Sequence, residues 1–330
     1  MIPNHLIDLG WNDHFGAQWI PDDSGDEVPA RVMAVHRGKI AISDGVTQRF
    51  VSPYIPGAQP DDDHPTVGDW VLTDRQTGEP TRVLTRMNLF KRRSPADPRK
   101  EQMIAANVDT VFIVSSCNQD FSVARLERYL VMAREIGVHP VIVLTKPDLT
   151  DDPAAFAQTA RALEPGLLVE TVDARDPAAV ETLATWCGRG KTVAFLGSSG
   201  VGKSTLVNTL RGSDSIVTQA IRAHDGTGRH TTTVREMHRL TRGGWLLDLP
   251  GMRELQLTEA AAGIAEVFDD VALIAQECRF SDCAHDREPG CAIRAAIASG
   301  ELTEERVARW HRLAVEDGTG GKRPTKRRSH

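Results

Sequence analysis

The sequence has little of what marks secreted, membrane-spanning or generally RNA-binding proteins. Its 330 residues include only five cysteines, and nothing marks secretion, so a disulfide framework is not expected. No apolar stretch approaches the roughly 20 residues that span a bilayer, and no signal-peptide pattern opens the chain. The net charge of −6 argues against undirected affinity for RNA. We therefore expect a cytoplasmic protein with no membrane contact, in which any RNA contact comes from local basic patches.

A phosphate-binding loop is the clearest feature that the chain does contain. Residues 197–204 have the form G-x-x-x-x-G-K-[ST], after an apolar run that predicts a strand and before a segment that predicts a helix. Glycines in such a loop let backbone N–H groups turn around phosphate oxygens, and the following helix adds its positive end. Lys203 is expected to reach the β- and γ-phosphates, and Ser204 to ligate Mg²⁺. The residues predicted to bind phosphate are Gly197, Ser198, Ser199, Gly200, Val201, Gly202, Lys203, Ser204 and Thr205.

A second segment, Thr145-Lys146-Pro147-Asp148, resembles the N-K-x-D element with which GTPases read guanine. The Asp148 carboxylate would accept hydrogen bonds from guanine N1 and N2, a donor pair that adenine lacks. Lys146 would lay its aliphatic stem along the base. Two residues depart from the GTPase pattern, because Thr145 replaces Asn and Asp173 replaces the Ser of the S-A element that helps to hold guanine. A strand end followed by a Pro-Asp turn is the plainer alternative.

Two later segments are interpreted as nucleotide-sensing switches. Asp248-Leu249-Pro250-Gly251 looks like the D-x-x-G element, in which Asp248 would hold Mg²⁺ through water and the Gly251 N–H would face the γ-phosphate. Residues 228–233 read Gly-Arg-His-Thr-Thr-Thr and are interpreted as the first switch. Either Thr232 or Thr233 would close on Mg²⁺ and the γ-phosphate, and the residues do not decide between them. The alternative is an ordinary loop before a Thr-rich strand.

The sequence lacks a water-orienting glutamine at the position where Ras-like enzymes have one. Met252 stands at the position of their glutamine, and a thioether cannot position water by hydrogen bonding. We therefore predict slow hydrolysis until a partner completes the site. His230 is the nearest substitute in the chain, because a neutral imidazole can accept a hydrogen bond from water; an exposed histidine without a catalytic role is the alternative.

The order of these elements along the chain is base reader, phosphate loop, first switch, second switch, whereas a conventional GTPase places the base reader last. In this order, and in the motifs R-H-T-T-T and D-x-P-G, the sequence resembles the circularly permuted GTPases, specifically the ribosome small-subunit-dependent GTPase A family. The resemblance covers about residues 28–313. It implies binding of GTP and GDP, hydrolysis stimulated by the small ribosomal subunit, contact with its rRNA, and a role in late maturation of that subunit. We expect a monomer.

A cysteine-histidine cluster near the carboxyl end predicts a metal site. Cys278, Cys283, His285 and Cys291 give the spacing C-x4-C-x-H-x5-C. Three thiolates and one imidazole make a closed tetrahedral set suited to one structural Zn²⁺, with no open position for chemistry. Cys117 and Cys187 lie outside this cluster and are interpreted as small buried residues. Bound metal should stabilise a helical module that is poor in apolar residues.

The expected architecture is multidomain: an N-terminal all-β OB-like barrel, a central α/β circularly permuted P-loop GTPase and a C-terminal helical zinc-binding module. Short β-rich runs separated by Gly, Asp and Pro predict the barrel. One continuous core strand is expected over 105–118, and helices over 123–136, 153–163 and 177–186. Predicted boundaries are 1–27 for an N-terminal extension, 28–94 for the barrel, 95–257 for the GTPase, 258–315 for the zinc module and 316–330 for a disordered basic tail.

Three points stay open in the sequence. Trp11, Phe15 and Trp19 in the N-terminal extension could pack or await a partner. A basic stripe between barrel and GTPase could face phosphates or be a solvated linker; its members are Arg82, Arg86, Lys91, Arg92, Arg93, Arg99 and Lys100. Two other functions compete with the GTPase: an RNA-binding scaffold with little turnover, favoured by Met252, and a P-loop ATPase, favoured by Thr145 and Asp173.

Overall fold

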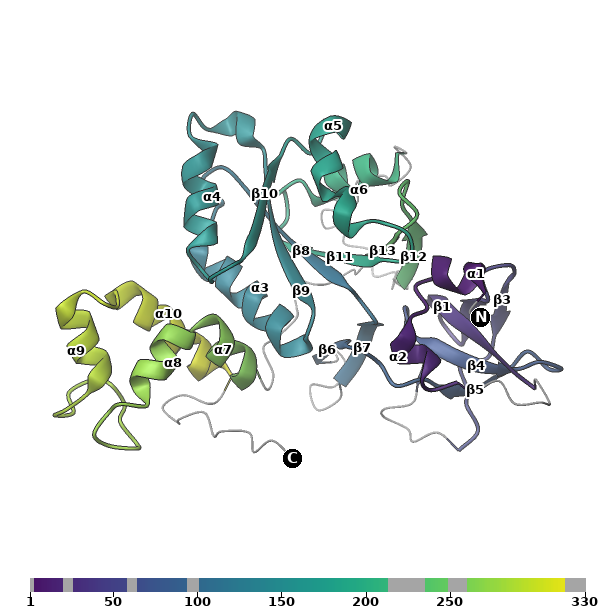
Figure 1. Cartoon of the computed structure of the whole chain (residues 1–330), viewed down its shortest axis with the longest axis horizontal. Coiled ribbons are helices and arrows are strands. Elements are labelled where there is room, and N and C mark those ends of the chain that lie inside the picture. The colour runs from purple at the N-terminus through teal and green to yellow at the C-terminus, as the bar shows by residue number, and fades with distance from the viewer. Residues whose placement is uncertain are drawn as a thin grey trace, which may run out of the picture.

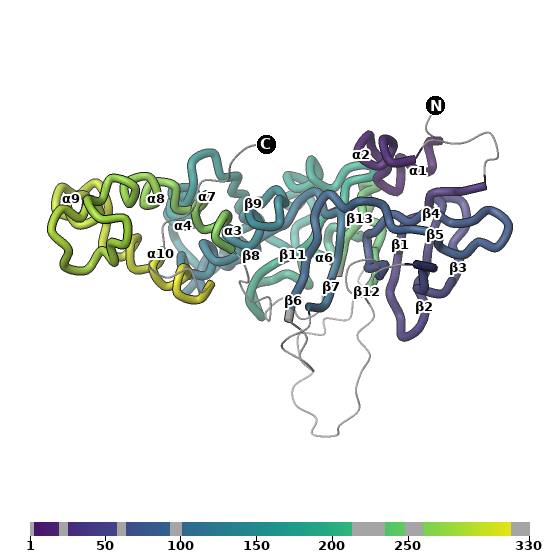
Figure 2. The backbone as a smooth tube through the Cα atoms, turned by 90° about the horizontal axis from the view of Figure 1, so that it is seen from below, coloured from purple at the N-terminus to yellow at the C-terminus, as the bar shows by residue number. Residues whose placement is uncertain are grey.

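The computed structural model describes residues 3–19, 26–57, 64–93, 101–212, 235–248 and 260–317. The barrel and the C-terminal helical module lie at opposite ends of an elongated molecule, with the GTPase between them (Figures 1 and 2). The first switch with His230, Thr232 and Thr233 lies outside the described residues, and so do Gly251, Met252 and residues 318–330 of the basic tail. Among the described residues, no helix combines the length and apolarity needed to cross a membrane.

A mostly parallel sheet forms the centre, in the order β10-β9-β8-β11-β13-β12. All neighbours pair in parallel except β12 and β13, which are antiparallel. Their bounds are β8 Thr110–Ser116, β9 His139–Thr145, β10 Leu168–Val172, β11 Thr192–Gly197, β12 Arg235–Arg239 and β13 Trp245–Asp248. The central strands β8, β9 and β11 are buried on both faces, which is why they read as continuous apolar runs. Strand order reverses between β8 and β11, the place where open α/β sheets bind ligands.

Helices cover both faces of this sheet (Figure 1). On one face, α3 and α4 pack against alternate strand residues such as Ile113 and Ile142, and on the other α5, η2 and α6 pack against Phe112 and Val143. The bounds are α3 Val123–Ile136, α4 Pro153–Arg161, α5 Pro177–Val180, η2 Glu181–Trp186 and α6 Lys203–Arg211, with a short 3-10 turn η1 at Pro147–Leu149. The helix expected over 177–186 is therefore one α-turn continued by a 3-10 helix.

Five antiparallel strands form the N-terminal sheet, paired in the order β3-β2-β1-β4-β5. Their bounds are β1 Glu27–His36, β2 Lys39–Ser43, β3 Gln48–Val51, β4 Trp70–Asp74 and β5 Pro80–Val83. Small and branched apolar residues of β1, β2 and β4 fill its core, in agreement with the predicted OB-like barrel. The end of β1 also pairs with β12, at Ala34 with Glu236 and at Val35 with Arg235. Barrel and GTPase thus share one hydrogen-bonded sheet.

The predicted single strand over 105–118 is wrong. The chain forms two strands there, β7 Glu101–Ala106 and β8, and β7 pairs with β6 Leu89–Arg93 in a separate hairpin. Asn107 breaks the strand with a left-handed φ of 59°. Its buried side chain accepts a hydrogen bond from Met87 N–H and donates one to the carbonyl of Gly68. An asparagine tolerates this conformation because its side chain can form hydrogen bonds locally. Apolar residues flank Asn107 on both sides, so the sequence read as one continuous strand.

The N-terminal extension packs, which settles the first open point. Its two short helices, α1 Asn4–Asp8 and α2 Asp13–Gly16, place Trp11 and Phe15 in the core against Trp70 of the barrel. Trp19 lies edge-on to Trp11 with a centroid distance of 5.9 Å. These aromatics are packing residues of the joint between extension and barrel.

A buried arginine ties three segments together at the same joint. The guanidinium of Arg31, on β1, donates to the backbone carbonyls of Leu9, Gly68 and Asn107. Burial lowers the pKa of Arg31 to about 10, which leaves it charged at neutral pH. Extension, barrel and the entry to the GTPase therefore converge on one side chain.

The basic stripe is not one surface. The Arg86 side chain forms a two-bond pair with the fully buried carboxylate of Asp69, at 2.8 Å for both bonds, so Arg86 is a structural residue. Arg82 donates to the carbonyl of Gln18, and Lys91 pairs with Glu101. Arg99 and Lys100 lie outside the described residues.

The C-terminal module contains four helices, α7 Ala261–Val267, α8 Asp269–Ala275, α9 Ala292–Ser299 and α10 Glu304–Glu316. It docks on α3 of the GTPase, where the buried Glu127 carboxylate accepts hydrogen bonds from Arg306 and Arg309 of α10. Arg306 also bonds Asp270 and the Val267 carbonyl. The module is thus fixed to the GTPase by buried charged groups as well as by apolar packing.

Candidate nucleotide and zinc sites

The predicted phosphate loop connects β11 to α6 at the carboxyl edge of the sheet. Gly197 has a φ of 143°, and a Cβ there would come within 2.3 Å of the Val114 carbonyl oxygen, so only glycine fits beside β8. Gly202 has a φ of 92° and caps α6, whose N-cap lacks a side-chain bond. The amino end of α6, which carries the positive end of the helix dipole, therefore faces the loop where an anion would bind. The Lys203 ammonium folds back onto the carbonyls of Gly197 and Ser198 within the loop.

Thr145 ties the base-reading segment to the phosphate loop. Its buried hydroxyl lies 2.5 Å from the Val201 carbonyl oxygen and 3.1 Å from that of Ser115. A Cβ on Gly202 would lie 3.3 Å from the same hydroxyl oxygen. The threonine that departs from the N-K-x-D pattern thus supplies a bridge from the base-reading segment to the loop.

The neighbouring Lys146 makes a second tie, since its ammonium donates to the Gly200 carbonyl at 2.6 Å. Lys146 has a left-handed φ of 55°, which turns the chain sharply from β9 into η1. Asp148 follows in η1, half-exposed, with its carboxylate 3.2 Å from the guanidinium of Arg175. Lysine, phosphate loop and carboxylate therefore face one region at the sheet edge.

The predicted site segments come together because the parallel strands that carry them all end at this edge. Thr145 ends β9, Gly197 ends β11 and Asp248 ends β13, while Asp173 follows β10. Register confirms the alignment, with Val172 opposite Thr145 and Gly197 opposite Val114. Asp248 pairs with Glu236 through the main chain. Residues far apart in the sequence thus meet at one edge of the sheet, the edge at which open α/β sheets bind ligands.

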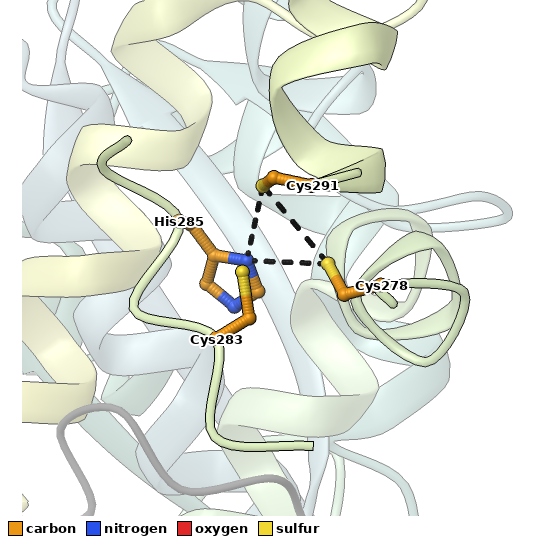
Figure 3. A group of neighbouring side chains, drawn as sticks. All are labelled: Cys278, Cys283, His285 and Cys291. Atoms are coloured by element: carbon orange, nitrogen blue, oxygen red, sulfur yellow. Dashed lines mark hydrogen bonds between the residues drawn. The ribbon is translucent and has the colours of Figure 1, made fainter. Parts of the chain in front are cut away.

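The four predicted metal ligands are within reach of a single ion. Their ligand atoms all lie within 4.8 Å of one another, and Figure 3 shows the side chains converging. Cys278 Sγ lies 3.5 Å from His285 Nδ1 and 4.0 Å from Cys291 Sγ, and Cys291 Sγ lies 3.6 Å from the same nitrogen. A tetrahedral zinc ion requires about 3.5 Å between sulfur and nitrogen and about 3.8 Å between sulfurs. The donor set therefore fits Zn²⁺ in both chemistry and spacing.

The backbone prepares this cluster for a metal. His285 has a left-handed φ of 62°, which brings its ring back over Cys278. Burial raises the pKa of the Cys278 thiol, but hydrogen bonds from the N–H groups of Ala292 and Ile293 and from the neighbouring thiols of Cys283 and Cys291 together bring it below its ordinary value. Thiolate is the form that binds zinc.

Comparison with known proteins agrees with this geometry. A model of the RsgA GTPase family matches residues 83–258. A protein of Mesorhizobium japonicum named small ribosomal subunit biogenesis GTPase RsgA is 47% identical over 315 residues, which cover 94% of this chain and 90% of the relative. A Vibrio parahaemolyticus protein named small ribosomal subunit biogenesis GTPase RsgA 2 is 45% identical, with coverage of 96% and 87%. The chain belongs to the RsgA GTPase family.

The fold of this family member is similar to two solved structures. YjeQ from Thermotoga maritima superimposes with a TM-score of 0.64 at 24% identity, covering 88% of this chain and 98% of that one. YloQ, described as a circularly permuted GTPase, gives a TM-score of 0.62 at 23% identity, with coverage of 88% and 95%. The fold likeness agrees with the predicted circular permutation, and membership of the RsgA GTPase family confirms the prediction of a GTP hydrolase.

Two arginines beside the nucleotide site escaped the sequence analysis. Arg125, in the first turn of α3, donates to the Ser198 hydroxyl of the phosphate loop at 2.8 Å. Arg175 joins Asp148 to Asp173. The signal for both was position, since Arg125 lies in the first turn of the helix that follows β8, and Arg175 comes three residues after β10. Neither belongs to a motif that names a role.

Proposed function

We propose that this chain is a cytoplasmic, monomeric GTP hydrolase that binds the small ribosomal subunit and its rRNA and assists late maturation of the subunit. Binding to the subunit would stimulate hydrolysis of GTP to GDP and phosphate. Family membership and the names of the relatives support the partner and the process. The barrel and the zinc module would hold the GTPase on the subunit from its two sides.

The observation that carries this proposal is the pair of ties between the base-reading segment and the phosphate loop. Thr145 and Lys146 bond the carbonyls of Val201 and Gly200. Those bonds hold the base reader directly against the phosphate loop, so that one ligand could contact both. A carboxylate at Asp148 then favours guanine over adenine, because ATP would leave it desolvated and unsatisfied.

In the proposed reaction, Lys203 and the N–H groups of the phosphate loop neutralise the β- and γ-phosphates, and Ser204 and Asp248 hold Mg²⁺. Thr232 or Thr233 and Gly251 would close on the γ-phosphate, and His230 would accept a hydrogen bond from the attacking water. Thr232, Thr233, Gly251 and His230 lie outside the described part of the chain, and of Asp248 only the backbone is described. Hydrolysis would reopen the switches and release the factor from the subunit.

We propose the barrel surface around β2 and β3 as the rRNA contact. Phe50 and Tyr54 expose 56% and 68% of their surface there. The Lys39 ammonium lies 4.2 Å from the centre of the Phe50 ring, and His36 stacks edge-on to that ring. Exposed aromatic rings among cations suit unpaired bases between phosphates.

Multiple-turnover phosphate release, with and without small ribosomal subunits, tests the enzymatic proposal. We expect slow release from GTP alone and a large increase with subunits; equal rates would instead favour a scaffold with little turnover. Competition of ATP against labelled GTP separates a GTPase from an ATPase, and equal displacement would overturn the guanine assignment. Co-sedimentation with subunits in GDP and in a non-hydrolysable GTP analogue tests the switch, which requires stronger association in the analogue.

A further inference from the structure

Beside the predicted base reader, a carboxylate and a guanidinium stand next to each other. Arg175 Nη2 lies 3.2 Å from Asp148 Oδ2, and the two residues follow neighbouring parallel strands, β9 and β10. The guanidinium does not swing freely, because its Nε and Nη2 donate to the two carboxylate oxygens of Asp173 at 2.9 and 2.8 Å. Such a two-bond pair fixes the plane of the arginine as well as its distance.

Asp173 is itself held against the backbone. Its Oδ1 accepts the N–H of Arg175 at 3.0 Å, which closes a turn within three residues. The side-chain bonds from Arg175 contribute most, and the backbone bond adds to them, so that the pKa of Asp173 falls to about 2. The carboxylate is therefore charged at any pH at which the protein works. The serine of the S-A pattern could not hold a guanidinium by two bonds. The departure at position 173 thus accounts for a fixed arginine at position 175.

A fixed pair of this kind presents a definite pattern of hydrogen-bond groups. The Asp148 carboxylate accepts, and the Arg175 guanidinium beside it donates. The Watson–Crick edge of guanine presents two donors, N2–H and N1–H, followed by the acceptor O6. The two patterns are complementary, and arginine is the common partner of guanine O6. Adenine would set its N6 donor against the cation and its N1 lone pair against the carboxylate.

Arg175 also has donors to spare. Its side chain is 64% exposed, and its Nη1 group has no hydrogen-bond partner within the described part of the chain. Thr145, whose hydroxyl is taken up by the phosphate loop, has no amide to offer the base. The two side-chain donors of the N-K-x-D segment, Thr145 and Lys146, thus both bond the phosphate loop, whereas Arg175 offers a donor for O6 one strand away.

We propose that Arg175 is a specificity residue for guanine, which donates a hydrogen bond to O6 while Asp148 accepts from N1 and N2, and that Asp173 is its positioning residue. This inference rests on the proposed guanine site. Without nucleotide, Arg175 neutralises Asp148, and entry of the base exchanges that ion pair for the bonds to guanine.

The test is equilibrium binding of GDP and of 6-thio-GDP, in which a sulfur that accepts hydrogen bonds weakly replaces O6. The wild-type chain is expected to prefer GDP. Arg175→Met, which keeps the apolar stem and removes every donor, is expected to weaken GDP binding about tenfold, the effect of one charge-assisted hydrogen bond, and to abolish the preference over 6-thio-GDP. Arg175→Lys should recover part of both, and Asp173→Ser should reduce the preference.

Two further variants separate the possible failures. Asp148→Asn must weaken GDP binding if the guanine site is correct; if it does not, the proposed function fails. If Asp148→Asn weakens binding but Arg175→Met binds GDP as well as or better than wild type, only the present inference is overturned, and Arg175 merely competes for Asp148. Arg242→Met removes another exposed arginine pair, with Glu181 near the opposite edge of the sheet, and should change neither affinity.

Discussion

The indole N–H of Trp245 donates a hydrogen bond to the backbone carbonyl of Asp8 at 2.8 Å, across 237 positions of sequence. Trp245 begins β13, the strand that ends at Asp248 of the predicted second switch. The Asp8 carboxylate also pairs with Arg189 of the GTPase. The N-terminal extension therefore contacts the GTPase directly, in addition to its packing on the barrel, and it fastens the two parts together.

Trp245→Phe is expected to lower the free energy of unfolding by about 1–3 kcal/mol, because it removes this hydrogen bond and leaves a smaller ring in a buried site. Urea denaturation followed by circular dichroism measures the change. Trp186→Phe is the control, since within the described part of the chain the Trp186 indole N–H makes no hydrogen bond. A Trp245 variant no less stable than the Trp186 variant would show that the contact contributes nothing.

Glu127 and Arg128 make adjacent but very different ion pairs on α3. The Glu127 side chain is fully buried against Arg306 and Arg309, whereas Arg128 meets Glu316 with both side chains about one-third exposed. Glu127→Gln should cost about 3 kcal/mol of unfolding free energy, because two cations lose their counter-charge in a buried place. Arg128→Gln should cost less than about 1 kcal/mol.

Denaturant midpoints of the two variants, compared at equal slope, test this difference. Equal midpoints would mean that the zinc module is not held on the GTPase by the Glu127 cluster. A midpoint of the Arg128 variant equal to that of the wild type is the expected outcome for an exposed ion pair, and it agrees with the proposed role of Glu127.

Regular elements and motif positions could be predicted from the sequence because each has a local cause. Helix α3 begins and ends where expected, at Val123 and Ile136, since its apolar spacing and the following Gly137 are both local signals. The zinc ligands fall within a short segment, and their spacing alone indicates the metal. The phosphate loop is likewise a contiguous motif between a strand and a helix.

What could not be predicted depends on partners distant in sequence. The break at Asn107 follows from contacts with Met87 and Gly68. Arg86 seemed part of a basic surface until Asp69 was placed beside it. Asp173 looked like a weakening of the guanine site, whereas its bonds to Arg175 give it a role that no single motif describes.

Removal of the metal should unfold the C-terminal module and leave the nucleotide site intact. Purified protein is expected to contain one zinc per chain, and Cys283→Ala should lose it, with a lower melting temperature, because three ligands hold zinc poorly and the module loses its binding free energy. GDP affinity should stay within about twofold, a change below 0.5 kcal/mol. The control is Cys187→Ala, which changes a cysteine buried beneath α5, η2 and α6 of the GTPase. This variant should retain one zinc per chain. Full zinc content in the Cys283 variant would refute the predicted ligand set.

Thr145→Val tests whether the hydroxyl between base reader and phosphate loop matters for binding. Valine fills the same buried space but cannot bond the Val201 carbonyl, which lies 2.5 Å from the threonine hydroxyl. We expect GDP affinity to fall about tenfold, the equivalent of one buried hydrogen bond, since the two halves of the site lose the tie that sets their spacing. Thr145→Ser keeps the hydroxyl and should keep most of the affinity.

Calorimetric titration with GDP measures these affinities, with Thr150→Val as the control. The Thr150 hydroxyl accepts a hydrogen bond from the Asp152 N–H in an exposed turn five residues away, so its loss should not affect the nucleotide. If Thr145→Val binds GDP as tightly as the Thr150 variant, the phosphate loop holds its place without the tie. The departure from asparagine at position 145 would then have no compensating role, and the case for Arg175 as the missing donor to guanine would rest on the 6-thio-GDP measurement alone.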